Sequence, residues 1–186
     1  ATAPAPPAPK DPAFLKNEVR MIASAAQSLA AAAALAKGEG WPVDILGDDL
    51  EGEASTLGTE HAKLALATQG PRLILSGGET TVTLKAKGRG GRNTEYLLAF
   101  ALGIDGAEQI NALAADTDGI DGSEDNAGAF ATGQTAQIIR ATGQNPATAL
   151  ANNDAYTAFA AANALFMTGP TGTNVNDLRA ILIGWP

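Results

Sequence analysis

Short apolar segments alternate with longer, Ala-rich or amphipathic segments along most of this chain, and this alternation limits the fold more than any other feature. Buried strands are expected at residues 41–46, 72–76, 109–115, 165–168 and 178–183. Helices are expected at residues 14–35, 53–69, 94–102, 131–141 and 155–162. Strands and helices that alternate through short connections favour an α/β fold, a layered α/β/α domain in which helices cover a central sheet.

Residues 79–87 follow a different pattern, because apolar and polar side chains alternate there with the period of a half-exposed strand. Val82 and Leu84 would share one face of that strand, with threonines and lysines on the other. The Gly-Gly pair at 77–78 indicates a turn, so we expect a hairpin with the strand at 72–76. A hairpin within an alternating chain predicts a mixed β-sheet.

The first twelve residues contain five of the ten prolines, which is typical of an extended linker. A linker usually joins two folded units, and the chain does not begin with Met. We therefore expect that a preceding domain has been cut away. After residues 1–12 the alternating pattern predicts one compact unit.

Composition excludes several classes of function. A net charge of -8 disfavours a surface that binds nucleic acid, because phosphate backbones require a basic patch. The chain has no cysteine, which removes thiol nucleophiles and zinc-thiolate sites and fits a reducing, cytoplasmic location. No apolar run reaches the roughly 18 residues of a membrane-spanning helix, so no membrane partner is expected. The single histidine, His61, lies in an Ala-rich segment and is expected at the surface.

The segment KAKGRGGRNTE, residues 85–95, is locally basic in an acidic chain. Its glycines permit close backbone approach, and a helix beginning near Asn93 would present free amides to an anion. Arg89 and Arg92 are candidates to grip phosphate or carboxylate together. The alternative is an ordinary turn with solvated charges.

Acidic residues follow the strand expected at 109–115, in the sequence DTDGIDGSED. Carboxylates at the carboxyl end of a strand occupy the place where open α/β sheets bind ligands. Asp116 and Asp118 are therefore candidates to hold magnesium or to accept a proton from a substrate hydroxyl. The alternative is a solvated loop whose aspartates cap neighbouring helices.

A third polar loop, TGPTGTNVNDL, lies between the last two expected strands. Thr171, Thr173 and Asn174 offer hydroxyl and amide groups to a polar ligand. The same composition suits a well-formed turn, which the residues alone favour. If the three loops form one site, residues 88–93, 116–125 and 170–175 should cluster at one end of the sheet.

Taken together and in order, four stretches resemble the MOFRL domain, the C-terminal part of GckA/TtuD-type (class II) glycerate kinases. The stretches are LSGGETTVTLKAKGRGGRNTEYLLAFA, DTDGIDGSEDNAGA, ALANNDAYTAFAA and TGPTGTNVNDLRAILI. Some members of this family carry the label hydroxypyruvate reductase. The resemblance divides the chain into a linker at 1–12, a preceding segment at 13–70 that packs with the domain, and a MOFRL domain at 71–186.

The resemblance implies transfer of a phosphoryl group from ATP to the 2-hydroxyl of D-glycerate, giving 2-phosphoglycerate, with Mg²⁺ assisting. It also implies that the active site lies in a cleft between the MOFRL part and an N-terminal Rossmann-like domain that binds most of the ATP. That domain has no counterpart in this sequence, so we expect the chain alone to be inactive. A second copy of the chain, as a homodimer, is a further candidate partner.

Roles for individual residues follow from the resemblance. Arg92 would bind the glycerate carboxylate or the transferring phosphate, and Asp116 or Asp118 would be the metal ligand or the base. Further candidates for substrate binding are Arg89, Asn93, Glu95, Thr171, Thr173 and Asn174. The alternatives are an NAD(P)H-dependent reductase, although no GxGxxG motif follows a strand, and a non-catalytic anion-binding module.

Overall fold

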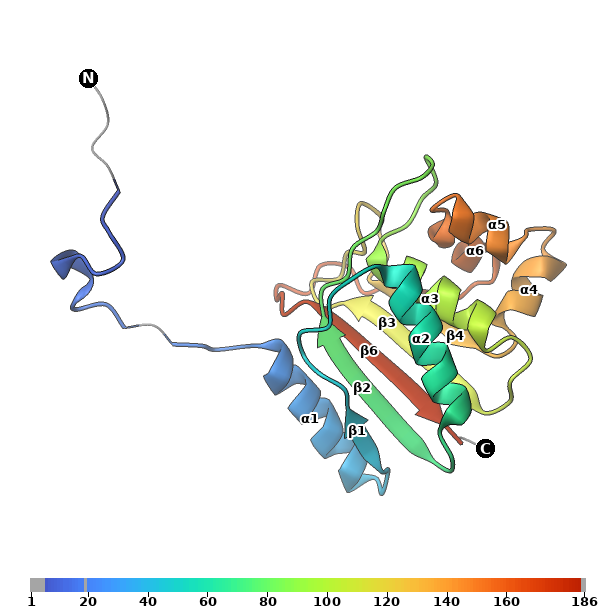
Figure 1. Cartoon of the computed structure of the whole chain (residues 1–186), viewed down its shortest axis with the longest axis horizontal. Helices are drawn as coiled ribbons and strands as arrows, with labels where there is room; N and C mark the ends of the chain where they lie inside the picture. Colours follow the sequence, from blue (N-terminus) through green and yellow to red (C-terminus); the bar gives the residue numbers. More distant parts are fainter. Residues whose placement is uncertain (1–5, 19, 185–186) are drawn as a thin grey trace.

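A computed structural model describes residues 6–18 and 20–184 and is built around a six-stranded sheet of order β1-β2-β6-β3-β4-β5 (Figure 1). The strands are β1 (Val43–Ile45), β2 (Arg72–Gly78), β3 (Ile110–Asp116), β4 (Gly128–Thr132), β5 (Leu165–Phe166) and β6 (Asp177–Ile183). β1 runs parallel to β2, and the other neighbouring pairs are antiparallel. The expected α/β fold with a mixed sheet is confirmed.

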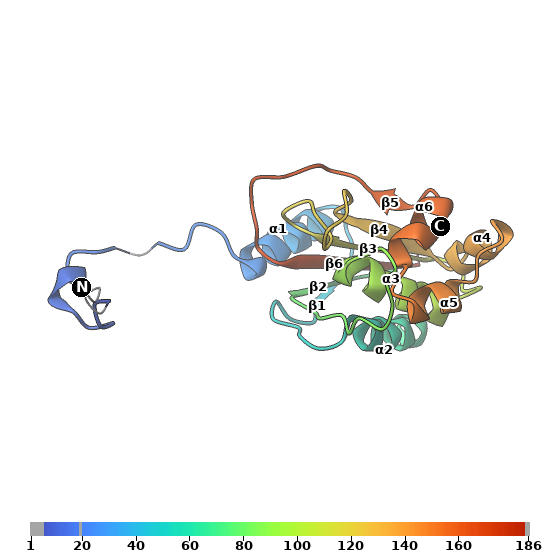
Figure 2. The ribbon, with the colours of Figure 1, turned by 90° about the horizontal axis from the view of Figure 1, so that it is seen from above.

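Helices lie on both faces of this sheet. They are α1 (Ala25–Gly38), α2 (Ala54–Ala67), α3 (Arg92–Gly103), α4 (Thr135–Ala141), α5 (Pro146–Ala151) and α6 (Ala155–Ala161). α1 packs on β1, β2 and β6, whereas α2 and α3 pack on each other across the opposite face, as Figure 2 shows. The helices α4, α5 and α6 all contact α3, so α3 is the centre of the larger helical layer.

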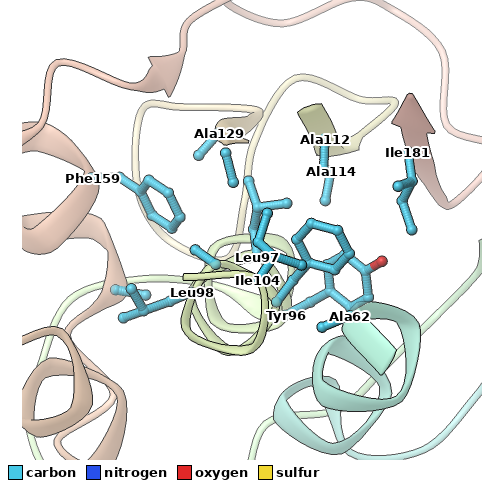
Figure 3. Packing of buried hydrophobic residues seen from close by; sticks show 14 of the residues in the cluster. Ala62, Tyr96, Leu97, Leu98, Ile104, Ala112, Ala114, Ala129, Phe159 and Ile181 are labelled. Atoms are coloured by element: carbon cyan, nitrogen blue, oxygen red, sulfur yellow. The ribbon is translucent and has the colours of Figure 1, made fainter. Parts of the chain in front are cut away.

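The two faces of β6 pack into two separate hydrophobic cores. Side chains alternate between the two faces of a strand, so Ile181 and Ile183 face the layer of α3 while Leu178 and Ala180 face α1. The larger core surrounds α3 (Figure 3), and its residue Phe100 is fully buried. Burial of one such side chain is worth about 1.5–3 kcal/mol, and nine of the twelve residues of α3 are buried.

The helices α2 and α3 approach closely because small residues line their contact. A Cβ atom at Gly58 would lie 2.2 Å from the carbonyl oxygen of Tyr96, which is closer than any real contact. Gly103 of α3 faces Ala62 of α2, where an added Cβ would lie 2.5 Å from the alanine methyl. The sequence therefore sets the spacing of this helix pair through two glycines.

The expected hairpin between β2 and residues 79–87 is wrong. β2 pairs with β1 on one side and β6 on the other, so neither edge of β2 can take a third strand. The segment is held instead by an isolated backbone bridge between Glu53 and Thr81 and by side chains, because the amide of Thr83 donates to Glu53 and the amide of Lys85 donates to Asn153. The sheet is mixed because β1 is parallel to β2.

The first helix begins later than expected. α1 starts after Ser24, whose hydroxyl accepts a hydrogen bond from the amide of Gln27 at 3.3 Å and caps the helix. The described residues before it lie away from the sheet (Figure 1) and include a short 3-10 helix, η1 (Pro12–Phe14). Ile22 is 92% exposed. The compact unit therefore begins near Ser24 rather than at residue 14, and residues 1–5 of the expected linker lie outside the described part.

The expected helix at 131–141 and the expected place of His61 also need correction. Ala131 belongs to β4, and α4 starts only at Thr135, because the Ala-rich composition hid a strand and a turn. α5 was not expected from the sequence. His61 is buried rather than at the surface, because it faces α3 across the close contact of the two helices. In the described residues, no helix is both long and apolar enough to cross a membrane.

Candidate functional site

The three polar loops come together at one edge of the sheet, where β2 and β3 end and β6 begins. Asp177 at the start of β6 pairs with Gly78 at the end of β2 and with Asp116 at the end of β3. The loop after β5 joins them, because the amide of Thr171 donates to the carbonyl of Asp118 at 3.0 Å. The expected clustering is confirmed.

Arg92 lies at the centre of this edge as the first residue of α3. Its side chain is 24% exposed and contacts three carboxylates. Its Nη2 atom donates to Asp116, its Nε donates to Asp177 at 2.8 Å, and its Nη1 lies 3.2 Å from Glu79. Ion pairs therefore fix this arginine. The alternative of an ordinary turn would require a solvated arginine, so it does not apply to Arg92.

Two residues of this network, Asp177 and Arg179, were not candidates from the sequence. The Asp177 side chain is 0% exposed and that of Arg179 is 1% exposed, and they form an ion pair of 2.6 Å. Burial lowers the pKa of the Arg179 guanidinium, and the charge of Asp177 opposes this change. The signal for both residues was available in the alternation of DLRAILI, which places them on the same face as Ile181.

The amino end of α3 does not present free amides, contrary to expectation. The buried carboxylate of Asp121 accepts hydrogen bonds from the amides of Asn93 and Thr94, each at 2.9 Å, and one from the Thr94 hydroxyl at 2.8 Å. Gly91 makes this approach possible, since a Cβ atom there would lie 2.4 Å from Asp121. Burial raises the pKa of Asp121, and these hydrogen bonds lower it. The acidic loop thus caps the helix itself.

Arg89 and Arg92 do not act as a pair. The Arg89 side chain forms an ion pair of 2.5 Å with Glu124, and its guanidinium carbon lies 4.1 Å from the centroid of the Tyr156 ring. Arg92 instead faces the carboxylates at the sheet edge. The expectation of a joint anion grip is therefore wrong, because the acidic loop supplies a separate partner to each arginine.

Asn93 and Glu95 are buried and take part in internal contacts. The side-chain Nδ2 atom of Asn93 donates to Asp177 at 2.8 Å, so Asn93 belongs to the network around Arg92. Both carboxylate oxygens of Glu95 accept from Asn153 at 3.3 Å. Burial raises the pKa of Glu95, which the hydrogen bond from Asn153 partly offsets.

A cavity of about 290 Å³ lies between the segment after β2 and the start of α3, and we call it the Arg92 pocket. It is lined by Thr80, Val82, Leu84, Gly88, Gly90, Gly91, Arg92, Glu95, Gly122 and Asn153. An arginine, three buried polar side chains and glycine backbone around a small volume suit a small anion with hydroxyl groups.

Asp116 and Asp118 follow β3 directly but have different surroundings. Burial raises the pKa of Asp116 to about 6, and its backbone hydrogen bond from Asp118 and the charge of Arg92 oppose this rise. The two oxygens of Asp116 accept from the amide of Asp118 and from Arg92. Asp118 accepts one hydrogen bond from the amide of Ile120 at 2.9 Å and a longer, weaker one from the side chain of Asn174 at 3.4 Å. Asp118 is therefore the less committed carboxylate.

These carboxylates do not form a magnesium site by themselves. Within the described ranges, no group of three or more acidic or histidine side chains is arranged to hold a metal ion. Asp116 is occupied by Arg92, which leaves Asp118 as a single carboxylate. Mg²⁺ in proteins usually keeps several waters and is bound by one or two carboxylates together with substrate phosphates, so Asp118 would need a bound nucleotide to complete a site.

The loop at 168–176 is a structured turn. The Thr171 hydroxyl donates to the carbonyl of Thr117 and accepts from the amide of Thr173 at 3.3 Å. The Asn174 side chain accepts from the amide of Asn176 at 3.1 Å and donates to Asp118. These polar groups hold the loop against the end of β3, so the turn that the residues alone favoured is present.

The fold and this edge define a layered α/β domain that carries a buried network of arginines and carboxylates beside a small pocket. Residues 72–177 match the model of the MOFRL family. The chain belongs to the MOFRL family.

Relatives of known name extend well beyond this chain. It is 52% identical over 179 residues to an Agrobacterium vitis protein named "Putative hydroxypyruvate reductase", covering 91% of this chain and 46% of that protein. It is 38% identical over 180 residues to D-glycerate 2-kinase of Thermotoga maritima, covering 92% of this chain and 43% of that protein. The crystal structure of glycerate kinase from Thermotoga maritima matches with a TM-score of 0.87 at 38% identity, covering 89% of this chain and 42% of that one. The chain thus spans less than half the length of these relatives.

Proposed function

We propose that this chain forms one wall of the active-site cleft of a glycerate 2-kinase, which transfers a phosphoryl group from ATP to the 2-hydroxyl of D-glycerate. The remaining wall, with most of the contacts to ATP, would come from a further domain of the full-length protein. In support, the chain is 38% identical to a protein named D-glycerate 2-kinase and covers 43% of its length. Alone, the chain would be inactive.

The observation that carries this proposal is the position of Arg92 on the wall of a small pocket at the open sheet edge. Phosphoryl transfer depends on positioning and on compensation of negative charge more than on covalent chemistry. Arg92 would contact the glycerate carboxylate or the transferring phosphate through Nη1, because Nη2 donates to Asp116 and Nε donates to Asp177. It would do so in place of Glu79, whose side chain is 56% exposed and can move into solvent at little cost.

The other candidate residues take different roles in this proposal. Glu95 and Thr80 would face the hydroxyl groups of the substrate from the pocket wall. Asp116 would hold Arg92, and Asp118, with its less committed oxygen, would accept the proton of the reacting hydroxyl. We choose Asp118 rather than Asp116 because a general base must lie within hydrogen-bond reach of the proton. Both oxygens of Asp116 already accept hydrogen bonds, from Arg92 and from the amide of Asp118.

The polar loop and the cofactors complete the proposal. Thr171, Thr173 and Asn174 would shape the rim of the cleft, because their side chains hold the loop to the end of β3. Arg89 would act only on the structure, through Glu124. Mg²⁺ would enter with the phosphates of ATP, and the described residues offer it no complete site.

The test is to supply the full-length protein with D-glycerate and ATP in one reaction and with hydroxypyruvate and NADH in another. We expect ATP consumption with formation of 2-phosphoglycerate, and no oxidation of NADH. NADH oxidation without ATP consumption would instead establish the reductase activity for which the Agrobacterium vitis relative is named. The 186-residue chain serves as the control, and it should turn over neither pair.

A further inference from the structure

Asp177 connects three donors from different parts of the chain. Its Oδ1 atom accepts from Arg92 Nε and from Asn93 Nδ2, each at 2.8 Å, and its Oδ2 atom accepts from Arg179 Nη2 at 2.6 Å. The carboxylate is fully buried at the first position of β6. Three strong donors on one buried carboxylate fix its orientation, so it is a rigid anchor.

The contact to Nε determines which part of Arg92 remains for a ligand. A guanidinium has one Nε–H on one side and four Nη–H donors at its far end. Asp177 occupies the Nε side from within the protein, and Asp116 occupies Nη2. The remaining Nη1 donor is directed toward Glu79, which is the exposed partner. A ligand that replaces Glu79 would thus meet an arginine whose orientation is already set.

Arg179 offsets the charge of this anchor. If Asp177, Asp116 and Glu79 faced Arg92 alone, three negative charges would surround one positive charge and the pocket would repel an anion. Arg179 adds a second positive charge on the far side of Asp177, at 1% exposure. It is held by the carbonyl of Gly77 and the hydroxyl of Thr80, each at 3.3 Å, and lies 5.3 Å from the Tyr96 ring centroid. With Arg179 included, the charges of these five groups sum to -1 instead of -2, so Arg179 reduces the repulsion that an approaching anion meets.

We propose that Asp177 is a positioning residue that holds Arg92 by its Nε atom, with Arg179 as the buried counter-charge that offsets part of the negative charge around Arg92. This inference rests on the proposed function for its catalytic consequence. Its geometric part concerns the chain alone. Neither residue contacts the substrate in this arrangement, so both act through Arg92.

The catalytic test uses the full-length protein with Asp177→Asn, which keeps the side-chain size and removes the charge. We expect turnover of D-glycerate to fall about 100-fold with a smaller change in the KM for ATP, since displacing a catalytic group by about 1 Å has this effect. In an Arg92→Ala background the same substitution should change turnover less than about threefold, because the residue it positions is gone. Equal losses in both backgrounds would overturn the proposal.

The matched control is Asp105→Asn. Asp105 forms an ion pair of 2.6 Å with the exposed Arg140, and this pair lies away from the site. The substitution should leave turnover within about twofold of the unsubstituted protein, as expected for an exposed ion pair. A loss at Asp105→Asn as large as that at Asp177→Asn would mean that removal of any ion pair slows the enzyme, and would overturn the specific role.

A second measurement does not depend on catalysis. In the isotope-labelled 186-residue chain, the Nε–H signal of Arg92, assigned by its loss in Arg92→Lys, should exchange slowly with water. Exchange should stay slow in Glu79→Gln and become fast in Asp177→Asn. Fast exchange in the unsubstituted chain would overturn the positioning role even if Asp177→Asn failed to fold and the enzyme proved to be a kinase. Slow exchange in a protein that consumes no ATP would support the anchor and reject the proposed function.

Discussion

The hydroxyl of Tyr96 lies 2.8 Å from Nδ1 of His61, and this buried pair joins α3 to α2. Burial, together with the smaller effect of the nearby charge of Arg179, lowers the pKa of His61 to about 4. Because the folded pKa lies below the ordinary value of 6.5, the folded chain favours neutral histidine. Stability from this residue is present above about pH 6.5 and is lost as pH falls toward 4.

We therefore expect His61→Gln to reduce the loss of stability between pH 7 and pH 4. The difference from the unsubstituted chain should reach about 3 kcal/mol, since each pKa unit is worth about 1.4 kcal/mol. Urea unfolding at several pH values measures it. Comparison of the two proteins is needed because Asp116, Glu95 and Asp121 have raised pKa values and act with the opposite sign. Identical pH dependence in both proteins would show that His61 is not a buried neutral base.

The contact between α2 and α3 predicts an unequal response to the same substitution at two helical glycines. Gly58→Ala would place a methyl group 2.2 Å from the carbonyl oxygen of Tyr96, and we expect it to lower the free energy of unfolding by about 2 kcal/mol or more. Gly38→Ala meets no atom within 4 Å and should change it by at most about 0.5–1 kcal/mol, in the stabilising direction. Urea unfolding compares the two. Similar effects would mean that the helices separate easily.

The cap of α3 predicts that Asp121 contributes more to stability than an exposed cap does. Asp121→Ala removes a buried carboxylate that satisfies two amides and a hydroxyl, and should cost about 3 kcal/mol. The control, Ser24→Ala at the start of α1, removes one contact of 3.3 Å and should cost about 1 kcal/mol. Chemical denaturation distinguishes them. A cost at Asp121 no larger than at Ser24 would contradict this account of the cap.

The network around Arg92 predicts that its shape matters more to activity than its charge. Arg92→Lys in the full-length protein keeps a positive charge near Asp116 and Asp177 but loses the planar fork. We expect turnover to fall about 100-fold and the free energy of unfolding to fall by only about 1 kcal/mol. Arg92→Ala is a poorer test, because it leaves buried carboxylates with fewer partners and also affects folding. Arg140→Lys, in an exposed pair, is the control, and equal kinetics in both lysine variants would remove Arg92 from the mechanism.

Local patterns were sufficient for most of the fold. Strand and helix periods are set by neighbours in sequence, so β2, β3, α2 and α3 were expected close to their actual bounds. The loops at the carboxyl ends of β2 and β3 were also recognisable, because their charged and glycine residues differ from the apolar sequence on either side. Ala-rich stretches were the exception, since alanine favours helices by propensity and tertiary packing placed it in a strand here, and β4 was missed for that reason.

The sequence by itself determined the layered α/β class and the four family motifs, and it identified Arg92 as a candidate site residue. Only the tertiary structure decided which partner each charge takes. Asp121 became a helix cap rather than a ligand-binding acid, and Arg89 and Arg92 were separated, because those contacts join residues about 30 positions or more apart. Asp177 and Arg179 acquired their role only when β6 was inserted between β2 and β3. Burial and charge compensation depend on that long-range pairing, which no local period encodes.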